Sequence, residues 1–151
     1  MIPEDQVGNA YLQYKREGGP DRYRVQSNRL IKTDASAPDL DLQPYYDRMV
    51  VGRLEKESDA EEASRLGALI NPVSGEAVSD SQDDAEVKLA LAEAQVECLR
   101  YKPADKATEI DAFFGEIDSI RAKGRQIKQD VRSDPAPGLI NIKDRWNNGN
   151  N

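Results

Sequence analysis

The chain has 151 residues, of which 32% are charged and 38% hydrophobic, so it can bury one modest core. Its net charge of -7 argues against a surface that grips nucleic-acid phosphates. The absence of histidine excludes Ser-His-Asp and Cys-His catalysis and His-ligated zinc, and the single cysteine, Cys98, excludes an internal disulfide. No apolar run approaches a membrane span and no signal peptide opens the chain, so we expect no membrane partner.

The first predicted element is a short helix from Pro3 to Glu17, which Gly18-Gly19-Pro20 then stops. Residues 18–44 are predicted to be an extended connector without a helix of its own. Within the connector, the stretch "YRVQSNRLIKT" fits two short strands around a turn at Ser27-Asn28, and it fits a polar loop equally well.

A helix is expected from Pro44, with an apolar face in the range 45–54. The following run "EKESDAEE" has no large apolar residue, and the capping-box spacing of Ser58 and Glu61 suits a second helix start. This pattern fits one long helix with a solvated middle, and it fits two helices with a break near Ser58 equally well. Further apolar residues follow at 66–70, and residues 71–82 have the composition of a loop.

The strongest pattern is an alanine-rich helix that starts near Asp83 and ends before Pro103. It carries two adjacent apolar stripes with few charges, which predicts a central helix that neighbours bury on several sides. Cys98 lies on this face and is expected to be a buried, inert thiol. The first stripe is Val87, Leu91, Ala94 and Cys98, and the second is Ala85, Leu89, Ala92, Val96 and Leu99.

The helix that follows Pro103 has a single apolar stripe to about residue 132 and is expected to form an antiparallel hairpin with the alanine-rich helix. Together these elements predict a mainly α fold, a small bundle of four or five helices in a domain over 1–132, with a short extended or β-hairpin element near 22–32. The predicted core comprises residues from 45–54 and 66–70 together with Val87, Leu91, Val96, Leu99, Phe113, Phe114, Ile117 and Ile120.

Residues 133–151 are predicted to form an extended C-terminal arm, because Asp134-Pro135-Ala136-Pro137-Gly138 cannot continue a helix. The apolar residues of the arm need a surface, on their own domain or on another subunit by strand addition. We expect residues 134–151 to contact another chain. The predicted contacts are Leu139, Ile140, Ile142 and Trp146.

Two basic groups are candidates for electrostatic contacts. The cations near the end of the last helix suit its negative dipole end, and they could also meet a phosphate or an acidic partner. The second group falls in the connector, where a local positive surface would more often meet an acidic protein than a nucleic acid. The candidates are Arg125, Lys128 and Arg132 in the helix and Arg22, Arg24, Arg29 and Lys32 in the connector.

The order of the parts resembles the head–tail connector, or head-completion adaptor, proteins of tailed bacteriophages. The resemblance rests on the helix "DDAEVKLALAEAQVECLRYK", the amphipathic helix "PADKATEIDAFFGEIDSIRAKGRQI" and the tail "DPAPGLINIKDRWNNGNN". It implies a structural adaptor that forms a homo-oligomeric ring, joins the portal to tail or neck proteins, and lines a channel through which DNA passes without specific binding. It also implies assembly in the host cytoplasm and a final place in the neck of the virion.

The resemblance brings no catalytic residues, and we expect no enzyme and no cofactor or metal. Acidic pairs such as Asp83 with Asp84 lie at helix starts or in polar loops, where they act as solvated capping charges. One alternative is a non-viral helical scaffolding or regulatory interaction protein. The other is a small acidic hydrolase or cation-binding protein, in which paired carboxylates would carry the chemistry.

Overall fold

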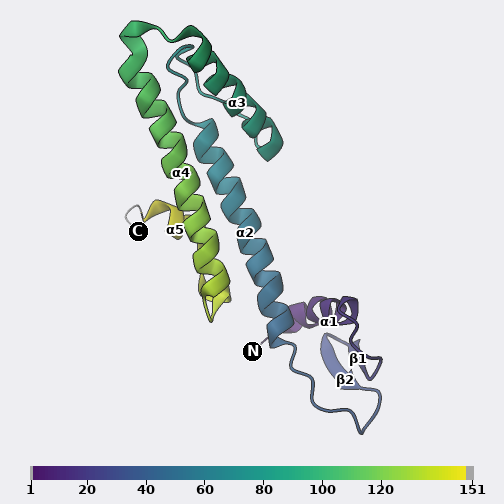
Figure 1. Cartoon of the computed structure of the whole chain (residues 1–151). Helices are drawn as coiled ribbons and strands as arrows, with labels where there is room; N and C mark the ends of the chain where they lie inside the picture. The colour runs from purple at the N-terminus through teal and green to yellow at the C-terminus, as the bar shows by residue number, and fades with distance from the viewer. Residues whose placement is uncertain (1, 149–151) are drawn as a thin grey trace. The chain divides into compact units, whose positions relative to one another are not determined.

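The computed structural model describes residues 2–148. In this part of the chain, five α-helices and one two-stranded antiparallel hairpin are present, and 65% of the structure is helical. This confirms the prediction of a mainly α protein built as a small helical bundle (Figure 1).

The chain divides into two compact units, which are described separately. Unit 1 comprises the described residues up to Arg53 together with Pro135–Leu139. Unit 2 comprises Leu54–Asp134 together with the described residues from Ile140 onward. Helix α2 (Gln43–Gly67) runs through the division as one helix, which decides between the one-helix and two-helix predictions.

Unit 1 begins with a 3-10 turn, η1 (Glu4–Gln6), that leads into helix α1 (Val7–Arg16). Gly18 follows α1 with a φ of 90°, a left-handed conformation that suits glycine and ends the helix. Strands β1 (Tyr23–Gln26) and β2 (Arg29–Lys32) then pair as an antiparallel hairpin, which decides in favour of strands over a polar loop. Ser27 and Asn28 both have positive φ values, as a tight hairpin turn requires. The core of this unit is formed by Ala10, Tyr14, Tyr23, Ala37 and Leu42.

Unit 2 is built on the C-terminal part of α2 and two further helices, α3 (Asp84–Tyr101) and α4 (Ala107–Ser133). The Asp83 carboxylate caps α3 by accepting from the Ala85 amide at 2.9 Å. Lys102, with a φ of 34°, ends α3, and the short turn η2 (Ala104–Lys106) starts the return along α4. Helices α3 and α4 therefore form the predicted antiparallel hairpin (Figure 1).

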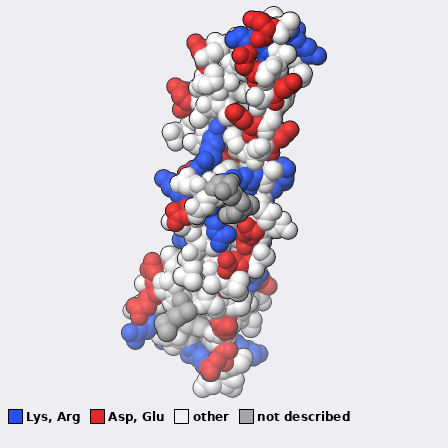
Figure 2. Space-filling model, turned by 90° about the vertical axis from the view of Figure 1, so that its left-hand side faces the viewer, with Lys and Arg blue, Asp and Glu red and all other residues white. Residues whose placement is uncertain are grey.

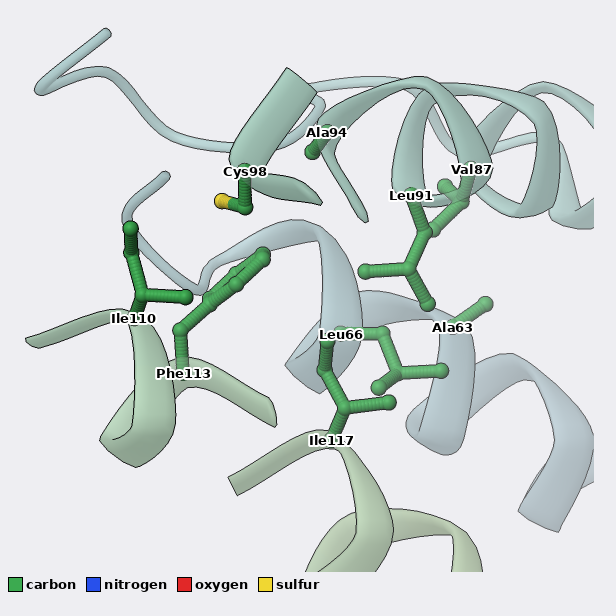
Figure 3. Close-up of a cluster of buried hydrophobic side chains, with 9 residues drawn as sticks. All are labelled: Ala63, Leu66, Val87, Leu91, Ala94, Cys98, Ile110, Phe113 and Ile117. Carbon is green, nitrogen blue, oxygen red and sulfur yellow. The ribbon is translucent and has the colours of Figure 1, made fainter. Parts of the chain in front are cut away.

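The core of unit 2 lies where these three helices meet. Figure 3 shows side chains from α2, α3 and α4 pointing toward one another. Phe114 and Ile120, also predicted for the core, are partly buried against this cluster. The buried members are Ala63, Leu66, Val87, Leu91, Ala94, Cys98, Ile110, Phe113 and Ile117.

The C-terminal segment differs from the predicted extended arm. Asp134-Pro135 ends α4, as expected, but the chain then forms the turn η3 (Pro137–Leu139) and the short helix α5 (Ile142–Asn147). The Asn141 side chain caps α5 by accepting from the Asp144 amide at 3.1 Å, a capping signal that the sequence prediction missed. The last residues of the predicted arm, 149–151, lie outside the described residues.

Candidate protein-interaction surface

The two apolar stripes of helix α3, which the sequence analysis described as adjacent, lie on nearly opposite sides of the helix. Its inner face, which includes Val87, Leu91 and Cys98, packs in the core of unit 2. Its other apolar stripe, called the outer stripe below, is exposed along its whole length. Residues seven apart return to almost the same side of a helix, so the alternating spacing of four and three draws a nearly straight ridge. The outer stripe is Ala85, Leu89, Ala92, Val96 and Leu99.

The exposure of the outer stripe corrects the sequence prediction. Leu89, Val96 and Leu99 are 63%, 53% and 56% exposed, so Val96 and Leu99 do not belong to the core. The physical reason is that α2 and α4 cover only the inner face, because both pack on the same side of α3. A helix that is apolar on two opposite faces normally has neighbours on both, and contiguous exposed apolar surface marks interaction sites.

A second apolar feature of unit 2 is an open groove between the segment that follows α2 and helix α4, called the α2–α4 groove below. It has a volume of about 420 Å³, and Ile70 at its side is 56% exposed. Ile70 falls within the range 66–70 predicted for the core, but it lies beyond the end of α2, where no other helix covers it. The groove is lined by Ala68, Leu69, Ile70, Pro72, Glu109, Ala112, Phe113 and Glu116.

A further cavity of about 330 Å³ lies at the turn between α3 and α4, with Leu99 and Phe114 among its lining residues. Cys98 also borders this cavity, but its side chain is buried. Burial raises the pKa of the Cys98 thiol, and its Sγ lies 3.7 Å from the Asn71 side-chain oxygen. A thiol that is buried and has a raised pKa is a poor nucleophile, in keeping with the predicted inert role.

Two of the four predicted arm contacts are buried within this chain. Ile142 and Trp146 lie on one side of α5 and are 3% and 2% exposed. The Trp146 indole Nε1 donates to the Ser58 hydroxyl of α2 at 3.2 Å, and this bond is itself buried. These side chains therefore do not need another subunit to cover them, because α2 and α4 supply the surface.

Several side chains of unit 2 hold α5 in place. The Lys123 ammonium donates to the Trp146 carbonyl at 2.6 Å and so neutralises the negative end of the short helix. The Arg65 guanidinium lies 5.3 Å from the centre of the indole ring, in a cation–π arrangement, and donates to the Asn147 side chain at 2.7 Å. Gly124 leaves room for the Glu62 carboxylate, which a Cβ would overlap, and burial raises the pKa of that carboxyl group.

The other two arm contacts behave differently from Ile142 and Trp146. Leu139, at the end of η3, is 87% exposed, and Ile140 is partly buried. Among the four predicted arm contacts, Leu139 is therefore the one whose side chain remains exposed.

The predicted basic group on α4 is largely paired with acids of α2. Arg132 donates to both carboxylate oxygens of Glu55 at 2.7 and 3.1 Å, and this contact lowers the pKa of Glu55. Lys128 forms an ion pair with Asp59, whereas Arg125 is exposed. On the described part of the face drawn in Figure 2, basic and acidic side chains are interspersed rather than gathered by sign.

The basic group in unit 1 is also partly neutralised. Lys32 pairs with Asp39 at 2.8 Å, which lowers the pKa of Asp39, and Arg29 lies 4.0 Å from Glu4. Arg22 and Arg24, on or beside β1, are exposed. The two predicted basic groups fall in different units.

The sequence analysis missed the α2–α4 groove and the surface that receives α5. The seven-residue spacing of Glu109 and Glu116, with Ala112 between them, puts all three on one side of a helix and could have indicated the groove. Among residues 2–148, no group of three or more cysteines and carboxylates is placed to hold a metal ion. In the same range, no helix has both the length and the apolar character needed to cross a membrane. Comparison with protein-family models, curated proteins and solved structures finds no match to this chain.

Proposed function

We propose that this chain is a non-catalytic structural adaptor that works by binding other proteins, first of all further copies of itself. The observation that carries the proposal is the outer stripe of α3, which exposes three large apolar side chains along one side of an otherwise well-packed helix. Burying apolar surface is the dominant favourable contribution to most protein association. A surface of this kind supports a role in assembly.

In its specific form, the proposal is that copies of the chain form a ring in the neck of a tailed-phage virion, between the portal and tail or neck proteins. The resemblance in the order of helices and tail is the ground for this form. The net charge of -7 suits the wall of a channel through which DNA slides, because like charges do not retain the phosphate backbone. Leu139, exposed in η3, is the arm residue that would reach a neighbour.

The proposal is tested first by the size of the purified full-length chain. Sedimentation velocity and native mass spectrometry should detect an oligomer of fixed size, and the fraction of the protein in this oligomer should rise with concentration. Electron microscopy should show rings. A chain that stays monomeric at every concentration contradicts the adaptor proposal. The genes next to its coding sequence test the specific form. Portal and capsid genes on either side support the phage neck, whereas cellular genes on both sides favour the non-viral scaffold.

A further inference from the structure

We infer that the outer stripe of α3 docks into the α2–α4 groove of a second copy of this chain, so that copies join head to tail. The inference rests on the proposed function, because it names the contact through which the copies would assemble. Both surfaces belong to unit 2, so the argument needs only the structure of that unit.

The first argument is the fit between a ridge and a groove. The outer stripe is a ridge of side chains on an 18-residue helix, about 27 Å long at 1.5 Å per residue. Helices pack when a ridge on one enters a groove on another. The α2–α4 groove offers about 420 Å³ beside the exposed Ile70, enough to receive side chains such as Val96 and Leu99.

The second argument is charge. Arg100 follows Leu99 directly and Lys102 is the residue after α3, and both side chains are exposed, so two cations lie at the C-terminal end of the outer stripe. Glu109 and Glu116 are exposed at the α2–α4 groove, two helical turns apart on α4. Opposite charges around an apolar contact steer the partners together and fix their register.

The third argument is the placement of the two surfaces. The inner face of α3 packs on α2 and α4, so the outer stripe faces away from the core, and only Leu99 at its end borders the cavity beside α4. The α2–α4 groove is lined instead by the segment that follows α2 and by α4. One copy therefore presents both surfaces at once, in different directions. Such a contact is heterologous, and repeating it gives a ring when the rotation closes. A contact smaller than the roughly 800 Å² per partner of a standard interface is weak alone, but ring closure lets each copy make two.

Two single substitutions at exposed positions test the inference. Val96→Glu blocks the stripe and Ile70→Glu blocks the groove, and each variant alone should be monomeric in sedimentation velocity over about a hundredfold range of concentration. An equimolar mixture should form dimers and nothing larger, because one intact stripe meets one intact groove. Leu12→Glu, at an exposed position of α1, is the matched control and should assemble like the unaltered chain.

The outcomes separate this inference from the proposed function. If the unaltered chain assembles and neither substitution weakens assembly, the inference is wrong and the adaptor function stands. If Ile70→Glu alone still forms dimers while Val96→Glu does not, stripes pair with stripes and the head-to-tail arrangement is wrong. A mixture that remains monomeric also overturns it. If the unaltered chain never assembles, the proposed function fails together with the inference.

A second pair of variants keeps the test decisive should replacing an apolar side chain by glutamate disturb folding. Arg100→Glu with Lys102→Glu reverses the flank of the stripe, and Glu109→Lys with Glu116→Lys reverses the groove. All four side chains are exposed, so circular dichroism should show unchanged helicity. Each double variant should self-associate at least about tenfold more weakly, and their mixture should recover assembly. Unchanged association of the separate variants, or no recovery on mixing, overturns the inference.

Discussion

Replacing Trp146 by alanine tests how firmly α5 is held on unit 2. Trp146 is 2% exposed, and removing such a side chain from a rigid site costs about 3–5 kcal/mol. The substitution also leaves the buried Ser58 hydroxyl without its indole partner, which costs a further 1–3 kcal/mol or so. Because α5 has only six residues, we expect the whole helix to leave the surface. The free energy of unfolding should then fall by no more than the free energy with which α5 docks on unit 2, about 2–4 kcal/mol.

The assay is urea denaturation followed by far-ultraviolet circular dichroism, with a chain truncated after Asn141 for comparison. If α5 leaves as a unit, Trp146→Ala and the truncation should lose the same free energy of unfolding. Lys143→Ala is the matched control, because this exposed side chain lies on the same helix and should cause no measurable loss. A loss below about 1 kcal/mol for Trp146→Ala, or a much larger loss on truncation, would refute the reasoning.

Three further predictions concern other parts of the chain. Asn28→Val should lower the free energy of unfolding by about 1–2 kcal/mol in thermal denaturation, because the turn holds Asn28 at a φ of 59°. The pKa of Glu55 is lowered by Arg132, so the carboxylate stabilises the fold above its ordinary pKa, and this stability is lost as the pH falls. Glu55→Gln should therefore lower urea stability at neutral pH and leave acid stability nearly unchanged. Cys98 should react with a thiol reagent at least about a hundredfold faster in denaturant than in buffer, because native labelling requires opening of the core.

The sequence predicts the limits of α1 and α3 well because those signals are local. Gly18 ends α1 and Asp83 caps α3 by means of side chains and backbone angles within a few residues. Local signals do not show that α2 continues through "EKESDAEE", because this polar stretch is stabilised by contacts with a helix far along the chain. Glu55 and Asp59 of this polar stretch pair with Arg132 and Lys128 of α4, far along the chain.

The C-terminal segment shows why part of the interaction surface escapes a sequence analysis. The sequence shows that Trp146 needs a surface, but it does not show which one. Ser58 and Gly124, two small residues on different helices, leave the space and one hydrogen-bond partner at the place where the indole lies. Neither residue has a local signature of this role, since serines are common in polar runs and a glycine within a helix can serve many purposes. The expectation of a partner subunit for Trp146 fails at this point.

Periodicity finds both apolar stripes of α3, but it cannot tell which of them the chain itself will cover. That depends on the number of helices that pack around α3, and unit 2 supplies α2 and α4 on one side only. The exposed stripe does not result from loose packing, because Val87, Leu91 and Cys98 on the inner face are almost completely buried. A chain with 38% hydrophobic residues has few large apolar side chains, yet three of them line this ridge. Leaving them in water forgoes the burial that stabilises helices in proteins, and a neighbouring copy seated on the ridge would recover it.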